Sequence, residues 1–90
     1  GRLQLLTALM DGGAPRGPRE LGLLFTSHGG VPPRATRALV VMRRPGHASH
    51  VGVYLRGRVL HLHERGPEFL PPAVASRGFE TVTYYVRREG

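Results

Sequence analysis

The chain contains no cysteine among its 90 residues. This absence excludes disulfide bridges, thiolate zinc sites and thiol nucleophiles from within the chain. Lysine, asparagine and isoleucine are missing as well, so arginine supplies all of the positive side-chain charge and the formal net charge is +7. The arginines are scattered singly or in pairs, such as Arg43-Arg44 and Arg87-Arg88, without a long basic block. This distribution favours acidic protein partners over nucleic acid.

Hydrophobic runs long enough to cross a membrane are also lacking, so membrane insertion is not expected. The first ten residues, GRLQLLTALM, contain a short apolar stretch, but DGGAPRGPRE comes next, where a signal peptide would have a small-residue cleavage site. The sequence therefore predicts synthesis and assembly in a cytoplasm. A chain of this length predicts a single domain, residues 1–90, with one modest core.

The first thirty residues are expected to be helical. Apolar residues at helical spacing predict a short helix over Leu3–Met10. A second helix is expected from about Pro18, with Gly29-Gly30 closing it. DGGAPRGPR, between the two, is rich in Gly and Pro and predicts a loop.

From Ala38 the character of the sequence changes to β-strand. ALVVM is typical of a buried strand, SHVGVYL and RVLHLHE of the two arms of a hairpin, and FETVTYYVRR of a closing strand. RGPEFLPPAVASRG is Pro-rich and is expected to be irregular, apart from a turn at 73–76. The predicted fold class is therefore α+β, with short N-terminal helices in residues 1–30 and a small antiparallel sheet, a meander, in residues 38–90.

The hairpin carries three of the five histidines, and its register decides how they lie. If Arg56-Gly57 is a two-residue turn, Val51, Val53, Leu55, Leu60 and Leu62 form one apolar face. The other face then pairs His50 with His63, Gly52 with His61 and Tyr54 with Val59, so that His50 and His61 are diagonal neighbours. A three-residue loop with a bulge would move the register by one and mix polar with apolar side chains on both faces.

Spacing alone leaves open what the histidines do. They could be solvated side chains on the exposed face of a half-buried hairpin. A His-x-His pair with a cross-strand histidine could also bind zinc or another transition metal through His50, His61 and His63. No fourth ligand is evident in the sequence, so the prediction is that no metal and no cofactor are bound.

SHVGVYLRGRVLHL resembles the second half of the NlpC-type papain-like peptidase domain. This family includes bacterial cell-wall endopeptidases and the peptidase-like component of long-tailed phage tail tips. The resemblance covers roughly residues 38–63 and implies that His50 matches the catalytic histidine, while His61 matches the residue that orients it. The segment before the first strand differs from the family pattern, because Thr36-Arg37-Ala38 stands where the family has Gly-Asp.

The nucleophile of that family is a cysteine at the start of a helix, and this chain has no counterpart. Aligning RELGLLF with the family motif places Glu20 at the cysteine position. A carboxylate cannot replace a thiolate in this type of amide cleavage. Ser27 is a substitute nucleophile by composition, but it lacks a nucleophile-elbow context. The resemblance thus implies a truncated, degenerate papain-like domain with vestigial His50 and His61 and without an active catalytic residue.

Three functions are expected from these features. The first is a non-catalytic structural or assembly subunit of a phage tail tip, part of the virion and bound to acidic neighbours in a larger assembly. The second is a peptidoglycan hydrolase that uses a non-cysteine nucleophile or one supplied by a partner. The third is a small basic nucleic-acid-binding protein, although no recognition helix or RNA-binding aromatic motif is present.

Overall fold

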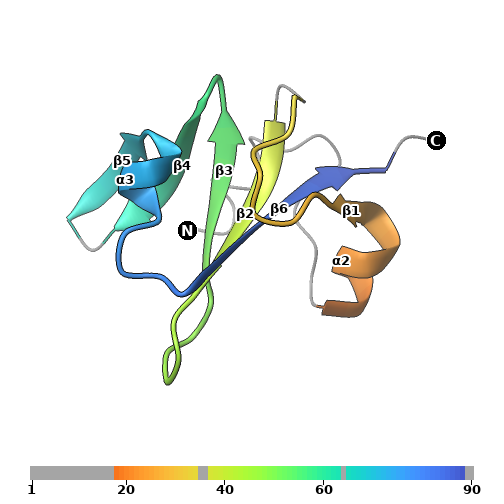
Figure 1. Ribbon diagram of the computed structural model, residues 1–90, viewed down its shortest axis with the longest axis horizontal. Coiled ribbons are helices and arrows are strands. Elements are labelled where there is room, and N and C mark those ends of the chain that lie inside the picture. Colours follow the sequence, from red (N-terminus) through yellow and green to blue (C-terminus); the bar gives the residue numbers. More distant parts are fainter. Residues whose placement is uncertain (1–17, 35–36, 64, 89–90) are drawn as a thin grey trace.

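A computed structural model describes residues 18–34, 37–63 and 65–88 of the chain. These residues form a six-stranded antiparallel sheet in the order β1-β6-β2-β3-β4-β5, with two short helices (Figure 1). The elements are α2 (Pro18–Leu24), β1 (Phe25–Ser27), β2 (Arg37–Arg43), β3 (His50–Leu55), β4 (Arg58–His63), β5 (Gly66–Leu70), α3 (Pro72–Ala75) and β6 (Thr81–Arg87).

The prediction of an α+β domain led by N-terminal helices is wrong for the described residues, which are mostly antiparallel sheet. The helix expected over Leu3–Met10 lies outside the described residues. The second helix begins at Pro18 as expected but ends at Leu24, well before Gly29-Gly30. Phe25–Ser27 instead pairs with β6, because an aromatic and a β-branched residue there can join the sheet edge.

Strand β5 lies in the segment expected to be irregular and is the outermost strand beside β4. Its burial alternates along the strand, with half-buried Glu68 and Leu70 on one side and exposed Pro67 and Phe69 on the other. Proline is tolerated here because an edge strand has one row of N–H groups that needs no partner in the sheet. The Pro-rich composition therefore concealed a strand with ordinary period-two alternation.

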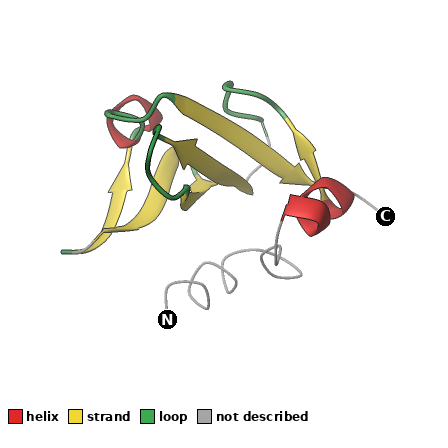
Figure 2. Cartoon of the chain, turned by 90° about the horizontal axis from the view of Figure 1, so that it is seen from below, coloured by secondary structure: helices red, strands yellow, loops and turns green. Residues whose placement is uncertain are grey.

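The predicted meander is right for β2, β3 and β4, and β5, which was not expected, extends it by one strand. Strand β6 does not continue beyond β5 but returns to pair with β2 and β1. The connection runs through α3 and residues 76–80 and crosses one face of the sheet on its way. Figure 2 shows α3 and α2 on opposite faces of the strongly twisted sheet.

Both faces of the sheet are covered, and each has its own buried cluster. On the first, which we call the α2 face, Leu21 and Leu24 of the helix pack against a cluster formed by Phe25, Leu39, Val41 and Val53. On the second, which we call the α3 face, Ala75 and Phe79 pack with Ala38, Val40, Met42, Val59 and Tyr84. Because β2 is covered on both sides, its residues 38–42 are all buried, as in a central strand.

The predicted hairpin register is confirmed. Leu55 pairs with Arg58, Val53 with Leu60, Tyr54 with Val59, and Gly52 with His61. Val51, Val53 and Leu55 all lie in or against the cluster on the α2 face, as expected for one apolar side of the hairpin. Arg56 and Gly57 form the turn with φ values of 53° and 81°, both in the left-handed region that a type I′ turn requires.

Candidate functional site

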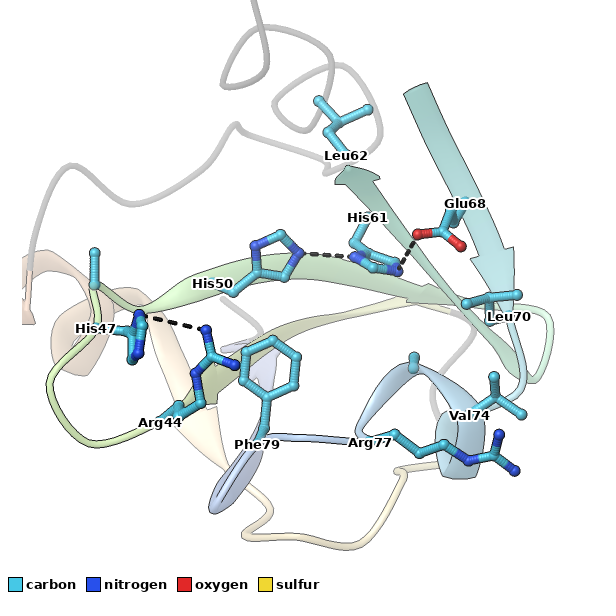
Figure 3. A pocket seen from close by; sticks show the side chains of 12 residues that line it. Arg44, His47, His50, His61, Leu62, Glu68, Leu70, Val74, Arg77 and Phe79 are labelled. Carbon is cyan, nitrogen blue, oxygen red and sulfur yellow. Dashed lines mark hydrogen bonds and ion pairs between the residues drawn. The ribbon is translucent and has the colours of Figure 1, made fainter. Parts of the chain in front are cut away.

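The histidines predicted to be diagonal neighbours are in direct contact on the α3 face. Nε2 of His50, at the start of β3, lies 2.8 Å from Nδ1 of His61 on β4, and the rings meet edge to face (Figure 3). This is a hydrogen bond in which one ring nitrogen donates and the other accepts. The hairpin register produces it, because Gly52 opposite His61 sets His50 one diagonal step away.

For His50 and His61, the alternative that the hairpin histidines are solvated on an exposed face is wrong. His61 is only 6% exposed, and the His50 ring is half-buried. Phe79, from the segment after α3, stacks on His50 with ring centroids 5.7 Å apart and an angle of 17° between the planes. The hairpin alone would leave this face open, and the chain segment that crosses from β5 to β6 covers it.

Gly52 permits the close approach of the two strands at this point. A Cβ atom there would lie 2.8 Å from the Leu60 carbonyl oxygen and 3.3 Å from Cβ of His61. The space beside His61 is therefore occupied by the backbone of β4. Any side chain larger than hydrogen would push β3 and β4 apart and move the two imidazoles.

Glu68 extends the pair to a third strand. Its Oε1 lies 3.7 Å from Nε2 of His61, within ion-pair range, and Glu68 pairs with His61 across β4 and β5. A carboxylate beside Nε2 favours a proton on that nitrogen, and a neutral His61 then has its lone pair on Nδ1. In this tautomer His50 donates from Nε2, so the basic lone pair of the pair is on Nδ1 of His50. With this tautomer, Nδ1 of His50 is the ring nitrogen of the pair that can accept a proton.

The histidine pair lies in the wall of a cavity of about 630 Å³. Figure 3 shows Arg44 and His47 on one side of it and Arg77 on the other, and Arg44 Nη2 lies 3.3 Å from His47 Nδ1. Apolar atoms complete the wall, contributed by Ala48, Leu62, Leu70, Val74, Ala75 and Phe79. Among the described residues that line the cavity, none carries a hydroxyl or thiol group.

The structure does not bring the two candidate nucleophile positions to this cavity. Glu20 lies on α2, whose leucines pack on the α2 face, the opposite side of the sheet. Ser27 pairs with Tyr85, which also packs on the α2 face, and its Oγ accepts a hydrogen bond from the Gly29 amide at 3.2 Å. Of the predicted site residues whose side chains the structure describes, only His50 and His61 are in contact with each other.

The metal alternative requires a third histidine. Residue 63 ends β4, and its side chain lies outside the described part of the structure. Across residues 18–34, 37–63 and 65–88, no group of three histidine or carboxylate side chains is arranged to hold a metal ion.

Sequence reasoning missed Glu68 and Phe79 as parts of the site. The alternation of PEFL was the available signal for Glu68, since it predicts that Glu68 shares a face with Leu70. For Phe79 no local signal existed, because its contact with His50 depends on the path of the chain from β5 to β6.

Comparison with protein-family models, curated proteins and solved structures finds no match to this chain. None of the helices in the described ranges is long and apolar enough to cross a membrane. A functional assignment therefore depends on the geometry of the site and on the sequence itself.

Proposed function

We propose that the chain is a non-catalytic structural or assembly subunit of a phage tail tip that carries the histidine hairpin of an NlpC-type peptidase. The observation that carries this proposal is that the histidine pair, which can act as a base, has no nucleophile beside it among the described residues of the cavity. His50 and His61 are hydrogen-bonded at 2.8 Å in the wall of a cavity, while the described residues around them offer no hydroxyl or thiol and the sequence has no cysteine. Acyl transfer by this chemistry needs such a group within reach of the base.

The resemblance of residues 38–63 to the peptidase family supports a location in the phage tail tip, because that family includes tail-tip components. This support is an analogy, since a fold or motif does not fix a function. The net charge of +7, supplied by arginine alone, supports binding to acidic neighbours through bidentate guanidinium–carboxylate contacts.

The test is to isolate native particles and identify their proteins by mass spectrometry, with an affinity-tagged copy of this chain expressed during infection. We expect the chain to co-sediment with tails at a fixed stoichiometry and to resist removal by nuclease. If it is absent from particles and instead co-purifies with nucleic acid that high salt releases, the nucleic-acid-binding function replaces this one.

A second candidate is a hydrolase whose thiol comes from another chain. The position of Glu68 beside His61 favours it, because this polarises the pair toward a base on His50. In that case assembled particles would cleave peptidoglycan in a reaction that iodoacetamide blocks and that His50→Ala abolishes. Cleavage that survives His50→Ala in assembled particles would exclude this candidate.

A further inference from the structure

A second hollow lies at the opposite end of β2 and β3 from the histidine cavity. It is a groove of about 670 Å³ whose walls include three arginines, Arg34, Arg37 and Arg56, together with Pro33, Tyr54 and Leu55. Arg37 begins β2 and pairs with Leu55 at the end of β3, which brings it beside the turn that carries Arg56. No acidic side chain lines this groove among the residues that the structure describes.

The turn holds Arg56 in a backbone conformation that arginine adopts rarely. Its φ of 53° is the only positive value at a non-glycine position in the described ranges. Gly, Asn and Asp are the residues that fit this position of a type I′ turn. A strained residue that the surrounding structure keeps in place points to a use for its side chain, and the Arg56 side chain lines the groove.

We propose that this groove binds an acidic segment of a neighbouring protein, with Arg34 and Arg56 contacting its carboxylates and the charge of Arg37 adding to the positive potential of the groove. The identity of the occupant as a neighbouring subunit rests on the proposed function, while the binding itself does not. Three guanidinium groups around one hollow create a positive potential that selects an anionic partner. The guanidinium groups of Arg34 and Arg56 can each form a bidentate contact with a planar carboxylate.

The walls favour a peptide over single-stranded nucleic acid. Binding of bases requires aromatic faces on which successive bases stack. Tyr54 is the sole aromatic residue among the described groove walls, and it is half-buried with its ring edge-to-face against Tyr84, at a centroid distance of 5.5 Å. Pro33 and Leu55 instead offer apolar surface for the side chains between the carboxylates of a peptide.

The experiment measures binding by fluorescence polarisation at low salt, with a short fluorescein-labelled peptide in which Glu alternates with Ser. The variants are Arg56→Asn in the groove and Arg19→Gln on the exposed side of α2, which removes the same charge elsewhere. We expect Arg56→Asn to weaken binding about five- to tenfold and Arg19→Gln less than about twofold. Because Asn-Gly is a preferred type I′ pair, Arg56→Asn should also raise the melting temperature, which rules out unfolding as the cause of the loss.

Three results would overturn the groove assignment. The first is equal affinity of Arg56→Asn and the unsubstituted protein for the peptide. The second is equal affinity of the protein for the Glu-Ser peptide and its Gln-Ser counterpart. The third is displacement of the peptide by single-stranded DNA at concentrations well below those of unlabelled peptide, which would assign the groove to nucleic acid. All three results concern the isolated protein, so they are distinguishable from absence of the chain in particles, which concerns the proposed function.

Discussion

Gly52 sets the distance between β3 and β4 and so the contact of the histidine pair. We expect Gly52→Ala to lower the free energy of unfolding by about 1–3 kcal/mol, because the new Cβ would lie 2.8 Å from the Leu60 carbonyl oxygen. Urea denaturation followed by circular dichroism measures the change. The same variant should break the imidazole hydrogen bond, which ¹⁵N chemical shifts of the ring nitrogens report.

Gly22 provides the matched control, since an added Cβ would meet no atom within 4 Å there and the residue lies in α2. Gly22→Ala should be neutral or stabilise the protein by about 0.5 kcal/mol, because alanine is the better helix former. Equal destabilisation by both substitutions would show that the close approach of β3 and β4 is not the reason why a side chain at position 52 destabilises the protein.

Tyr84 is the residue whose ionisation should couple to stability. Burial, and then the neighbouring Tyr54, raise the pKa of the Tyr84 phenol above its ordinary value of 10.0. The folded protein therefore holds this proton more tightly than the unfolded chain does. Stability from this group is complete below pH 10 and falls as the pH rises from there through the folded-state pKa. Unfolding measured between pH 8 and 11 should show this decline.

Tyr84→Phe is the control for that titration, since it keeps the ring and removes the ionisable group. The alkaline loss of stability should be smaller in this variant than in the unsubstituted protein. Identical pH dependence of the two proteins would mean that Tyr84 does not contribute.

At the scale of elements, the segment from α3 to β6 covers the α3 face of the hairpin formed by β3 and β4. Phe79, on this segment, stacks on His50 and packs in the cluster of the α3 face. We expect Phe79→Ala to cost about 2–3 kcal/mol of unfolding free energy, less than for a fully buried phenylalanine. Hydrogen exchange should then accelerate in β3 near His50, because the cover of that end of the strand is lost.

Phe69→Ala is the matched truncation on β5. Phe69 is 42% exposed and its ring lies 6.0 Å from the Arg58 guanidinium, so less burial is lost there. It should cost less than Phe79→Ala and leave exchange at His50 unchanged. A larger loss at Phe69 than at Phe79 would contradict the role assigned to the segment that crosses the sheet.

The same elements show what the sequence could predict and what it could not. Period-two burial fixes the register of a hairpin, so Leu55–Arg58, Val53–Leu60 and the diagonal contact of His50 with His61 could be derived from residues 49–63 alone. The end of α2 could not be predicted from the sequence, because Phe25–Ser27 becomes a strand only through pairing with β6, which is distant in sequence. The cover over His50 likewise depends on a long-range crossing, because Phe79 stacks on its ring from the segment between α3 and β6.

At the scale of the whole molecule, the two hollows lie at opposite ends of β2 and β3 and differ in composition. The histidine cavity combines a proton acceptor with Arg44, Arg77 and the carboxylate of Glu68. The arginine groove has no acidic residue among its described walls. The two hollows share no lining residue. Binding of a partner in the arginine groove therefore does not require a catalytic function in the histidine cavity.

The described parts of the molecule lack a complete hydrolytic site, so we predict that the isolated protein does not hydrolyse peptidoglycan. A hydrogen-bonded histidine pair can accept a proton, but amide cleavage by this route also needs a group that attacks the carbonyl carbon. The sequence contains no thiol, and Ser27 lies on the opposite face of the sheet from His50. We expect no release of soluble muropeptides from purified peptidoglycan by metal-free protein, measured by chromatography, and the same result for His50→Ala. Fragment release that His50→Ala abolishes would establish a nucleophile that this chain's described cavity does not show, and would contradict the proposed non-catalytic role.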